Sequence, residues 1–294
     1  MIPTTLYELK KFFDFVELED RVIITKATDC LKRYDINFSI TLPKMLDNNK
    51  LIYLPYNCSG LFANCRGLTY LSLECLSDTS NVTDTSYMFS GCEKLKFLRF
   101  GRINTSNVTN ISGMFEGCLN LESVDLEALN TSDVTDMSRM FTGCDALKYF
   151  NLKNFNTSKV TNMSEMFADS GHADTIDLSS FDTSKVTDMS GMFRSCYMSE
   201  LNLSNFDTSK VTNMSSMFED SGLEKLDLTS FNTSNVINMS LMFAGCDCLN
   251  ELNVSSFDIE KVSDITNMFI ECTEEIIPDW YKKLQQSKIT SFFN

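Results

Sequence analysis

Apolar residues recur along most of the chain with a period of about 26 residues. The pair Met-Phe marks this period most clearly, because it returns every 25 or 26 residues from Met88-Phe89 to Met268-Phe269. A more degenerate unit contains Leu61-Phe62, 27 residues before Met88. A period this regular is typical of a solenoid, in which each unit buries its apolar side against its neighbours.

Every unit also contains a short alternation of apolar and polar residues, which predicts a β-strand. In the unit LNLSNFDTSKVTNMSSMFEDSGLEK, Leu201 and Leu203 flank a polar residue, and the other units have an equivalent Leu-x-Leu pair. Stacked in register at roughly 4.8 Å per strand, these segments would form a parallel sheet of about eight short strands.

The remainder of the unit forms a second limb. A phenylalanine such as Phe206 is followed by Asp/Asn-Thr-Ser, which has turn and capping chemistry. Then come Val-Thr-Asp/Asn-Met and the Met-Phe pair, whose apolar members we expect to point inward. The sequence leaves two conformations open for this limb, a short strand or a helical turn.

The two ends of the chain depart from the repeat, and a repeat array needs caps at its ends. Residues 1–57 predict an N-terminal cap or small capping domain, with a helix over 5–15 and strands over 22–25 and 51–54. Residues 58–273 form the predicted repeat solenoid. Residues 274–294 predict a C-terminal cap, with a short helix opened by Pro278.

The run IDLSSFDTSKVTDMSGMFRSC, which begins at Ile176, resembles the BspA-like leucine-rich repeats of bacterial surface proteins. The resemblance covers about residues 58–272. It implies an α/β-type repeat solenoid, a right-handed leucine-rich-repeat-like coil of about eight to nine repeats of 25–27 residues, with a parallel β-sheet face and a cap at each end. It also implies adhesion or protein binding, although one repeat type serves many partners.

The net charge of −15 narrows the choice of partners. Direct nucleic-acid binding normally requires a basic footprint, so we expect none. An acidic surface is repelled by anionic lipid, and no apolar run reaches membrane-spanning length, so we expect no membrane association. The charge favours docking on a protein partner, and a basic partner would complement it; the sequence does not define an oligomeric state.

The N-terminal segment lacks the pattern of a secretory signal peptide, because Asp14 interrupts its apolar run. We therefore expect an intracellular, cytoplasmic location. A cell-surface location would require that a signal peptide had been removed.

Seven of the eleven cysteines occupy one position of the repeat, three residues after the phenylalanine. Ser170 and Ser221 replace cysteine there in two units. This interchange favours a column of small buried thiols, with weak hydrogen bonds to the turn, over metal ligands or redox thiols. So many free thiols predict a reducing compartment.

Catalytic chemistry has little support. The single histidine, His172, lies in the irregular loop SGHAD, and every triad or His-metal site would have to use it. The pair Cys246-x-Cys248 is too small for a zinc site, and phosphate-binding glycine loops are absent. We expect no catalysis, no metal and no cofactor.

Asp and Asn alternate in columns along the repeat. The residue between the two Leu positions is Asp or Asn in six successive units, from Asp125 to Asn253. Equivalent side chains on neighbouring strands lie roughly 5 Å apart. The column is therefore interpreted in one of two ways: as an acidic recognition stripe or weak cation site, or as a hydrogen-bonded ladder that keeps the strands in register. A second column runs from Asp84 to Asp264. A third, which precedes Thr-Ser, is expected to cap turns.

The favoured function is a protein–protein interaction module that binds a macromolecular partner through the sheet face. Its candidate binding residues flank the Leu positions, and they are Arg99, Arg102, Asp125, Glu127, Tyr149, Lys153, Asp177, Asp227 and Glu251. Two alternatives remain open. One is an acidic intracellular inhibitor that occupies the nucleic-acid channel of a host enzyme, as a phage-type defence antagonist would. The other is a surface adhesin.

Overall fold

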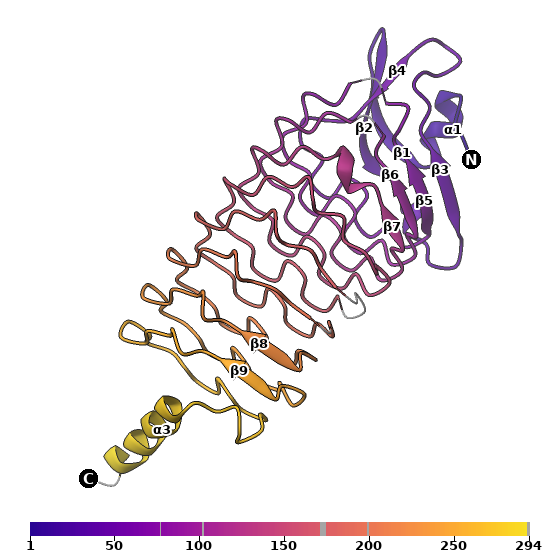
Figure 1. Cartoon of the computed structure of the whole chain (residues 1–294). Coiled ribbons are helices and arrows are strands. Elements are labelled where there is room, and N and C mark those ends of the chain that lie inside the picture. The colour runs from indigo at the N-terminus through magenta and orange to yellow at the C-terminus, as the bar shows by residue number, and fades with distance from the viewer. Residues whose placement is uncertain (77, 102, 171–174, 199, 293–294) are drawn as a thin grey trace.

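The computed structural model describes residues 1–76, 78–101, 103–170, 175–198 and 200–292. Its repeats stack along one axis, from the N-terminal elements at one end to helix α3 (Asp279–Phe292) at the other (Figure 1). The predicted repeat solenoid with parallel pairing between its turns is thus confirmed.

The N-terminal end carries a small sheet of its own, in the order β1-β2-β4. Strand β1 (Phe13–Glu17) runs antiparallel to β2 (Arg21–Ala27), and β4 (Leu51–Tyr53) lies parallel to β2. The two predicted strands are present, but the helix predicted over 5–15 is wrong beyond Lys11. A Thr5–Glu8 capping box starts α1 (Leu6–Lys10), and the alternation that follows pairs with β2 as a strand.

Two further N-terminal elements were not predicted. They are the short helix α2 (Asp29–Lys32) and strand β3 (Phe38–Thr41). Strand β3 pairs in parallel with β5 (Leu68–Ser72) of the first repeat, so the N-terminal segment extends the solenoid's own sheet.

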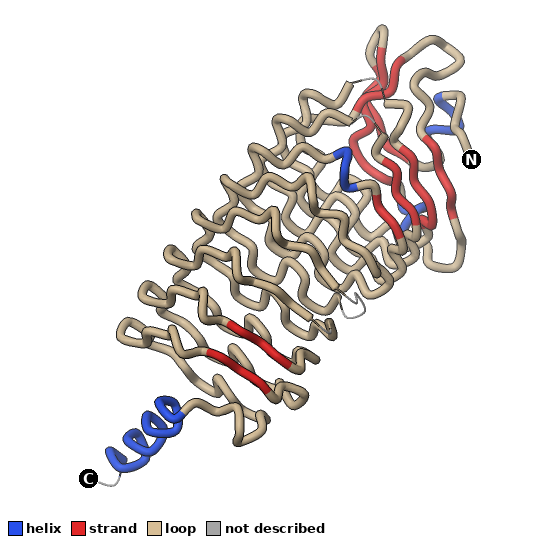
Figure 2. Tube along the Cα trace, viewed as in Figure 1, coloured by secondary structure: helices blue, strands red, loops and turns tan. Residues whose placement is uncertain are grey.

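The Leu-x-Leu limbs form two separate stretches of sheet (Figure 2). The first has the order β3-β5-β6-β7, with β6 at Phe97–Arg99 and β7 at Ser123–Val124, followed by the 3-10 turn Leu126–Ala128. The second pairs β8 (Lys225–Asp227) with β9 (Glu251–Asn253). Between them only an isolated bridge, Thr175 to Glu200, is formed among the described residues. The expectation of one continuous sheet of about eight strands is therefore wrong.

The continuous ladder runs along the second limb instead. Isolated parallel bridges join the Asp/Asn positions of successive repeats without a break, from Asn57–Asp84 to Asn238–Asp264. The rest of this limb is a series of tight turns, two residues of which commonly have positive φ, as at Arg139 (57°) and Gly143 (70°). The limb is thus neither a regular strand nor a helix.

The core is organised around a column of stacked phenylalanine rings. Nine rings, from Phe62 to Phe269, lie with neighbouring centroids 5.2–5.9 Å apart and ring planes 3–16° from parallel. Offset stacking at these separations is favourable for aromatic side chains. Val160, Met163 and Met166 show the pattern of the other apolar positions, since each is fully buried.

A buried threonine ties each repeat to the next. Thr157 Oγ1 donates to the carbonyl oxygen of Asp182 at 2.9 Å and accepts from the Asp182 N–H at 2.8 Å. The same pair of bonds recurs at Thr79, Thr105 and Thr131. This threonine therefore satisfies backbone groups that would otherwise be buried without partners.

Candidate partner-binding face

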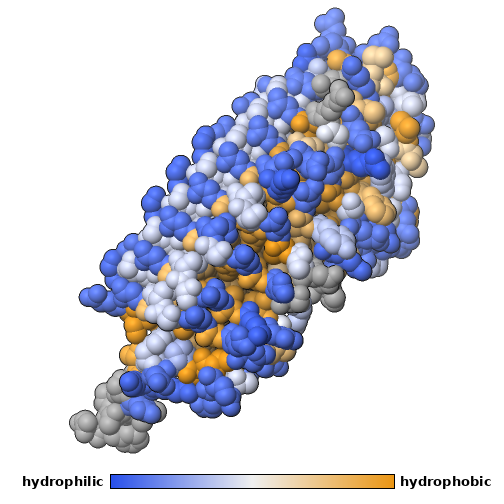
Figure 3. Space-filling view, in the orientation of Figure 1, coloured by the Kyte–Doolittle hydropathy of each residue, from blue (hydrophilic) through white to orange (hydrophobic). Residues whose placement is uncertain are grey.

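The outward residues of the Leu-x-Leu limbs form a surface that we call the Leu-x-Leu face. Because side chains alternate along an extended segment, two residues of each limb point away from the core, one before the first apolar position and one after it. Figure 3 shows apolar surface along this side of the molecule, bordered by polar residues.

The N-terminal part of this face contains a hollow of about 540 Å³, which we call the N-terminal hollow; it is lined by Tyr70, Glu74, Phe97, Leu98, Arg99, Ser123, Val124 and Asp125. Phe97 is 43% exposed in the middle of it. Arg99 lies 3.6 Å from the Glu74 carboxylate, and Lys96 lies 2.8 Å from Glu122 beside the hollow. These two ion pairs and the Asp125 carboxylate therefore surround an exposed aromatic ring.

The central repeats present Tyr149, which is 77% exposed. Asn151 Nδ2 donates to Glu127 Oε1 of the preceding repeat at 2.6 Å. Lys153 and Asp177 are exposed nearby on the same face. These residues lie on the part of the face between the two hollows.

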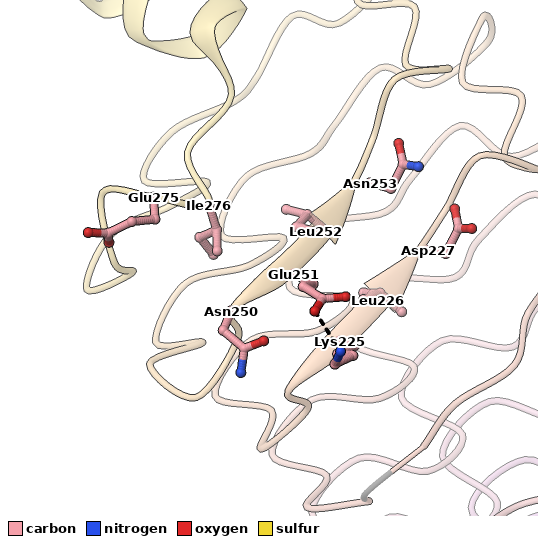
Figure 4. A pocket seen from close by; sticks show the side chains of 9 residues that line it. All are labelled: Lys225, Leu226, Asp227, Asn250, Glu251, Leu252, Asn253, Glu275 and Ile276. Carbon is pink, nitrogen blue, oxygen red and sulfur yellow. Dashed lines mark hydrogen bonds and ion pairs between the residues drawn. The ribbon is translucent and has the colours of Figure 1, made fainter.

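The second hollow, of about 660 Å³, lies at the C-terminal end of the face and is called the C-terminal hollow. It is lined by Lys225, Leu226, Asp227, Asn250, Glu251, Leu252, Asn253, Glu275 and Ile276. Strands β8 and β9 supply most of this lining, and the segment that leads to α3 supplies Glu275 and Ile276 (Figure 4). Lys225 Nζ donates to Glu251 Oε1 at 2.5 Å across the two strands.

Net charge is distributed unevenly along the molecule. Residues 1–57 contain eight acidic and eight basic residues, so the charge of −15 arises entirely from the repeats and the C-terminal segment. Residues 195–275 contain 14 acidic and three basic residues. The acidic character is thus concentrated at the end of the solenoid that holds the C-terminal hollow.

The Asp/Asn columns are mainly turn-forming. In the column between the Leu positions, Asp177 Oδ1 accepts from the Ser179 N–H at 3.0 Å, and Asp227 accepts likewise from Thr229 at 3.0 Å. The hydroxyl and N–H of Ser179 lower the pKa of Asp177. The other two columns show the same bond, as at Asp136 and Asn156. Turn chemistry, expected for the third column alone, therefore occurs in all three.

A cross-repeat amide ladder, which the alternation suggested, is replaced by these turns. Cross-repeat bonds donated by the side-chain amide are present at two described asparagines of the columns, Asn151 and Asn213. These turns could have been predicted for all three columns from the sequence, because Ser or Thr commonly stands two residues after the Asp or Asn of each column.

The cysteine column is structural. The Sγ of Cys118 donates to the carbonyl oxygen of Phe89 at 3.2 Å, and Cys144 bonds in the same way to Phe115 at 3.2 Å. Burial raises the pKa of Cys118 and Cys196 to about 12, so these thiols stay protonated. The prediction of buried thiols is confirmed for six of the seven cysteines of this column, whereas Cys272 in the last repeat is only partly buried.

Two residues named from the sequence, Arg102 and His172, lie outside the described residues. Within the described part of the chain, no group of three or more His, Cys, Asp or Glu side chains could hold a metal ion. In the same part, no helix has the length and apolar character needed to cross a membrane.

A family model described as "Mycoplasma protein of unknown function, DUF285" matches residues 56–175, 120–230 and 195–290. These matches span the whole repeat region. The chain belongs to the DUF285 family. Comparison with curated protein sequences gave no match.

Several solved structures are similar to this DUF285 chain, among them two leucine-rich repeat proteins and a leucine-rich cell surface protein. TpLRR of T. pallidum is 18% identical, with 94% of this chain and 93% of that chain covered and a TM-score of 0.36. A protein from Bacteroides ovatus is 14% identical, with 90% and 76% covered and a TM-score of 0.49. A cell surface protein from Faecalibacterium prausnitzii is 14% identical, with 82% and 92% covered and a TM-score of 0.29.

The eight described candidate residues are all exposed on or beside the Leu-x-Leu face of the DUF285 repeats. Arg99 and Asp125 line the N-terminal hollow, whereas Asp227 and Glu251 line the C-terminal hollow. The other four lie outside both hollows.

Sequence reasoning missed several lining residues of these hollows. Tyr70 and Phe97 directly precede the first apolar position of their limbs, so strand alternation alone could have placed them outward. Glu275 had no such pattern, because its place depends on how the C-terminal segment crosses the last repeat (Figure 4).

Proposed function

We propose that this chain is a protein–protein interaction module that holds a macromolecular partner on its Leu-x-Leu face. The observation that supports this function is the pair of hollows on one face, with the 77% exposed Tyr149 on the surface between them. Exposed aromatic residues are enriched among side chains that dominate binding energy at interfaces. Spaced anchor points on a repeated surface suit recognition of a single extended partner.

The charge distribution favours this function over a mimic of nucleic acid. A mimic that filled a long basic channel would carry acidic groups along its whole length. Here the N-terminal residues 1–57 are balanced, and residues 195–275 carry most of the excess negative charge. We also propose that the chain works in a reducing compartment, where the thiols of its cysteine column stay reduced.

Site-specific photo-crosslinking tests the proposed function. A benzophenone amino acid replaces Tyr149 on the Leu-x-Leu face in one variant and Thr187 on the second limb in another. Both side chains are exposed, so each probe can reach a bound partner without disturbing the core. In a lysate of the cells in which the chain is native, we expect a discrete adduct from position 149 and none from position 187. Equal adducts from both positions, or none from position 149, would refute binding through this face.

A further inference from the structure

The C-terminal hollow suggests what kind of partner segment binds at that end of the face. Building on the proposed function, we propose that this hollow binds a lysine- or arginine-bearing extended segment of the protein partner. The cationic side chain lies over the apolar floor of the hollow and its charged head meets the carboxylates around it.

The arrangement of the lining supports this occupant. Leu226, Leu252 and Ile276 form the apolar part, and the carboxylates Asp227, Glu251 and Glu275 come from three separate segments around it (Figure 4). Lysine and arginine have apolar stems and charged heads, so they pack well where apolar surface borders carboxylates. A purely apolar or an anionic side chain would displace water from these carboxylates without supplying a cation in its place.

Lys225 shows that the hollow accommodates an ammonium group. Its Nζ bonds to Glu251 at 2.5 Å, and this contact raises the pKa of the lysine. Both side chains are about two-thirds exposed, at 63% and 65%, so the pair is accessible to competition. A partner's cation would share or displace this contact.

Asp227 is held ready to accept a cation. Its Oδ1 accepts from the Thr229 N–H at 3.0 Å, and the N–H and hydroxyl of Thr229 lower the pKa of the carboxyl. The carboxyl is therefore ionised at neutral pH, and one of its oxygens is held by the turn. The equivalent position is Asn in the adjacent repeats, at Asn202 and Asn253, so Asn can replace Asp227 while the turn is kept.

The surrounding charge complements a cationic segment. Residues 195–275 carry 14 acidic and three basic residues. The lining of the C-terminal hollow has three carboxylates and one lysine, whereas that of the N-terminal hollow has two carboxylates and one arginine. Long-range attraction therefore steers a positively charged segment to the C-terminal end and gives the partner one preferred direction along the face.

The test uses a fluorescein-labelled eight-residue peptide of alternating Lys and Val, with a Glu/Val peptide as negative probe. Its affinity for the full chain is measured by fluorescence anisotropy at low and moderate salt. A triple variant, Asp227→Asn with Glu251→Gln and Glu275→Gln, removes the carboxylates of the hollow. A control triple variant, Asp220→Asn with Glu260→Gln and Glu271→Gln, changes the net charge equally at exposed positions outside the hollow lining.

We expect the hollow variant to bind the Lys/Val peptide at least tenfold more weakly, and the control variant to stay within about twofold of the wild type. Lys225→Gln should tighten binding severalfold, because it removes the internal competitor, and by more than Lys210→Gln, which changes the charge elsewhere. Equal losses in both triple variants, or no binding by the wild type, would overturn the inference.

This experiment separates the inference from the proposed function. If a partner crosslinks at position 149 but the chain does not bind the Lys/Val peptide, the interaction module stands. The proposal that the C-terminal hollow binds a cationic segment is then wrong. Thermal unfolding of each variant confirms that the fold is retained.

Discussion

Tyr281 closes the phenylalanine stack by packing edge-on against Phe269, with ring centroids 5.0 Å apart and planes at 71°. At the other end, Phe13 meets Phe62 in the same way, at 5.9 Å and 88°. An edge-on ring places its positive rim on the negative face of its neighbour and offers no parallel face for another repeat. Each end of the array is therefore terminated by an aromatic residue from outside the repeat.

Removing this ring should destabilise the C-terminal end of the array. Tyr281 is 8% exposed, so Tyr281→Ala creates a cavity beside Phe269, and we expect a loss of about 3 kcal/mol in the free energy of unfolding. Urea denaturation measures the loss, and hydrogen exchange should show it first in the last two repeats. Lys283→Ala, at an exposed position of the same helix, is the control and should change stability by less than about 0.5 kcal/mol. An unchanged midpoint for Tyr281→Ala would mean that α3 does not cap the array.

The threonine that joins neighbouring repeats offers a sharper test of polar bonding. Thr157→Val keeps the shape of the side chain but leaves the Asp182 N–H and carbonyl without their hydroxyl partner. Because an unsatisfied buried group costs about 1–3 kcal/mol, we expect a loss of about 2 kcal/mol in urea denaturation. Thr157→Ser retains the hydroxyl and should lose less than half as much. Equal losses in the two variants would mean that the hydroxyl contributes no more to stability than the methyl group does.

The core could be predicted from the sequence because each core side chain packs against the side chain at the same position of the neighbouring repeat. The repeat period therefore identifies the core residues. Phe62 shows this well, since its place 27 residues before Phe89 was enough to assign it to the stack that it starts. The exchange of Cys for Ser170 likewise indicated a small buried side chain that bonds to the turn, and Ser170 Oγ does donate to the Phe167 carbonyl.

The sheet and the hollows depended on three-dimensional relationships that a repeat pattern does not contain. Leu152 and Leu178 keep the Leu-x-Leu burial pattern, yet their limbs lack regular strand pairing. Burial requires only that a side chain point inward, whereas a ladder requires backbone groups of successive repeats to align. Glu275 enters the C-terminal hollow from a segment outside the period, so no column identified it.

The buried thiols predict loss of stability in alkali. Burial raises the pKa of Cys118 and Cys196 to about 12 and that of Cys246 to about 11, against about 8.5 in an unfolded chain. The folded state therefore binds the thiol protons more tightly than the unfolded state does. The stability that this difference contributes is fully present below about pH 8.5 and is lost as the pH rises toward 11–12. Urea midpoints measured from pH 7 to 11 should fall. The double variant Cys118→Ser/Cys144→Ser should flatten the curve; a curve parallel to the wild type would contradict the assignment.

Backbone conformation gives a prediction in the stabilising direction. Ser216 has a φ of 55°, in the column where the repeats at Gly113 and Gly191 have glycine at 57° and 59°. A non-glycine residue in this left-handed region is strained, and Ser216→Gly relieves the strain. The greater conformational freedom of glycine in the unfolded state offsets part of this gain, so we expect a net stabilisation of about 0.5 kcal/mol. Ser215→Gly is the matched control, because it removes a hydroxyl that donates to Asn213 Oδ1 at 2.9 Å, and it should destabilise by about 1 kcal/mol. Urea denaturation of both variants decides the matter, since a loss of stability in Ser216→Gly would show that the left-handed turn is not strained.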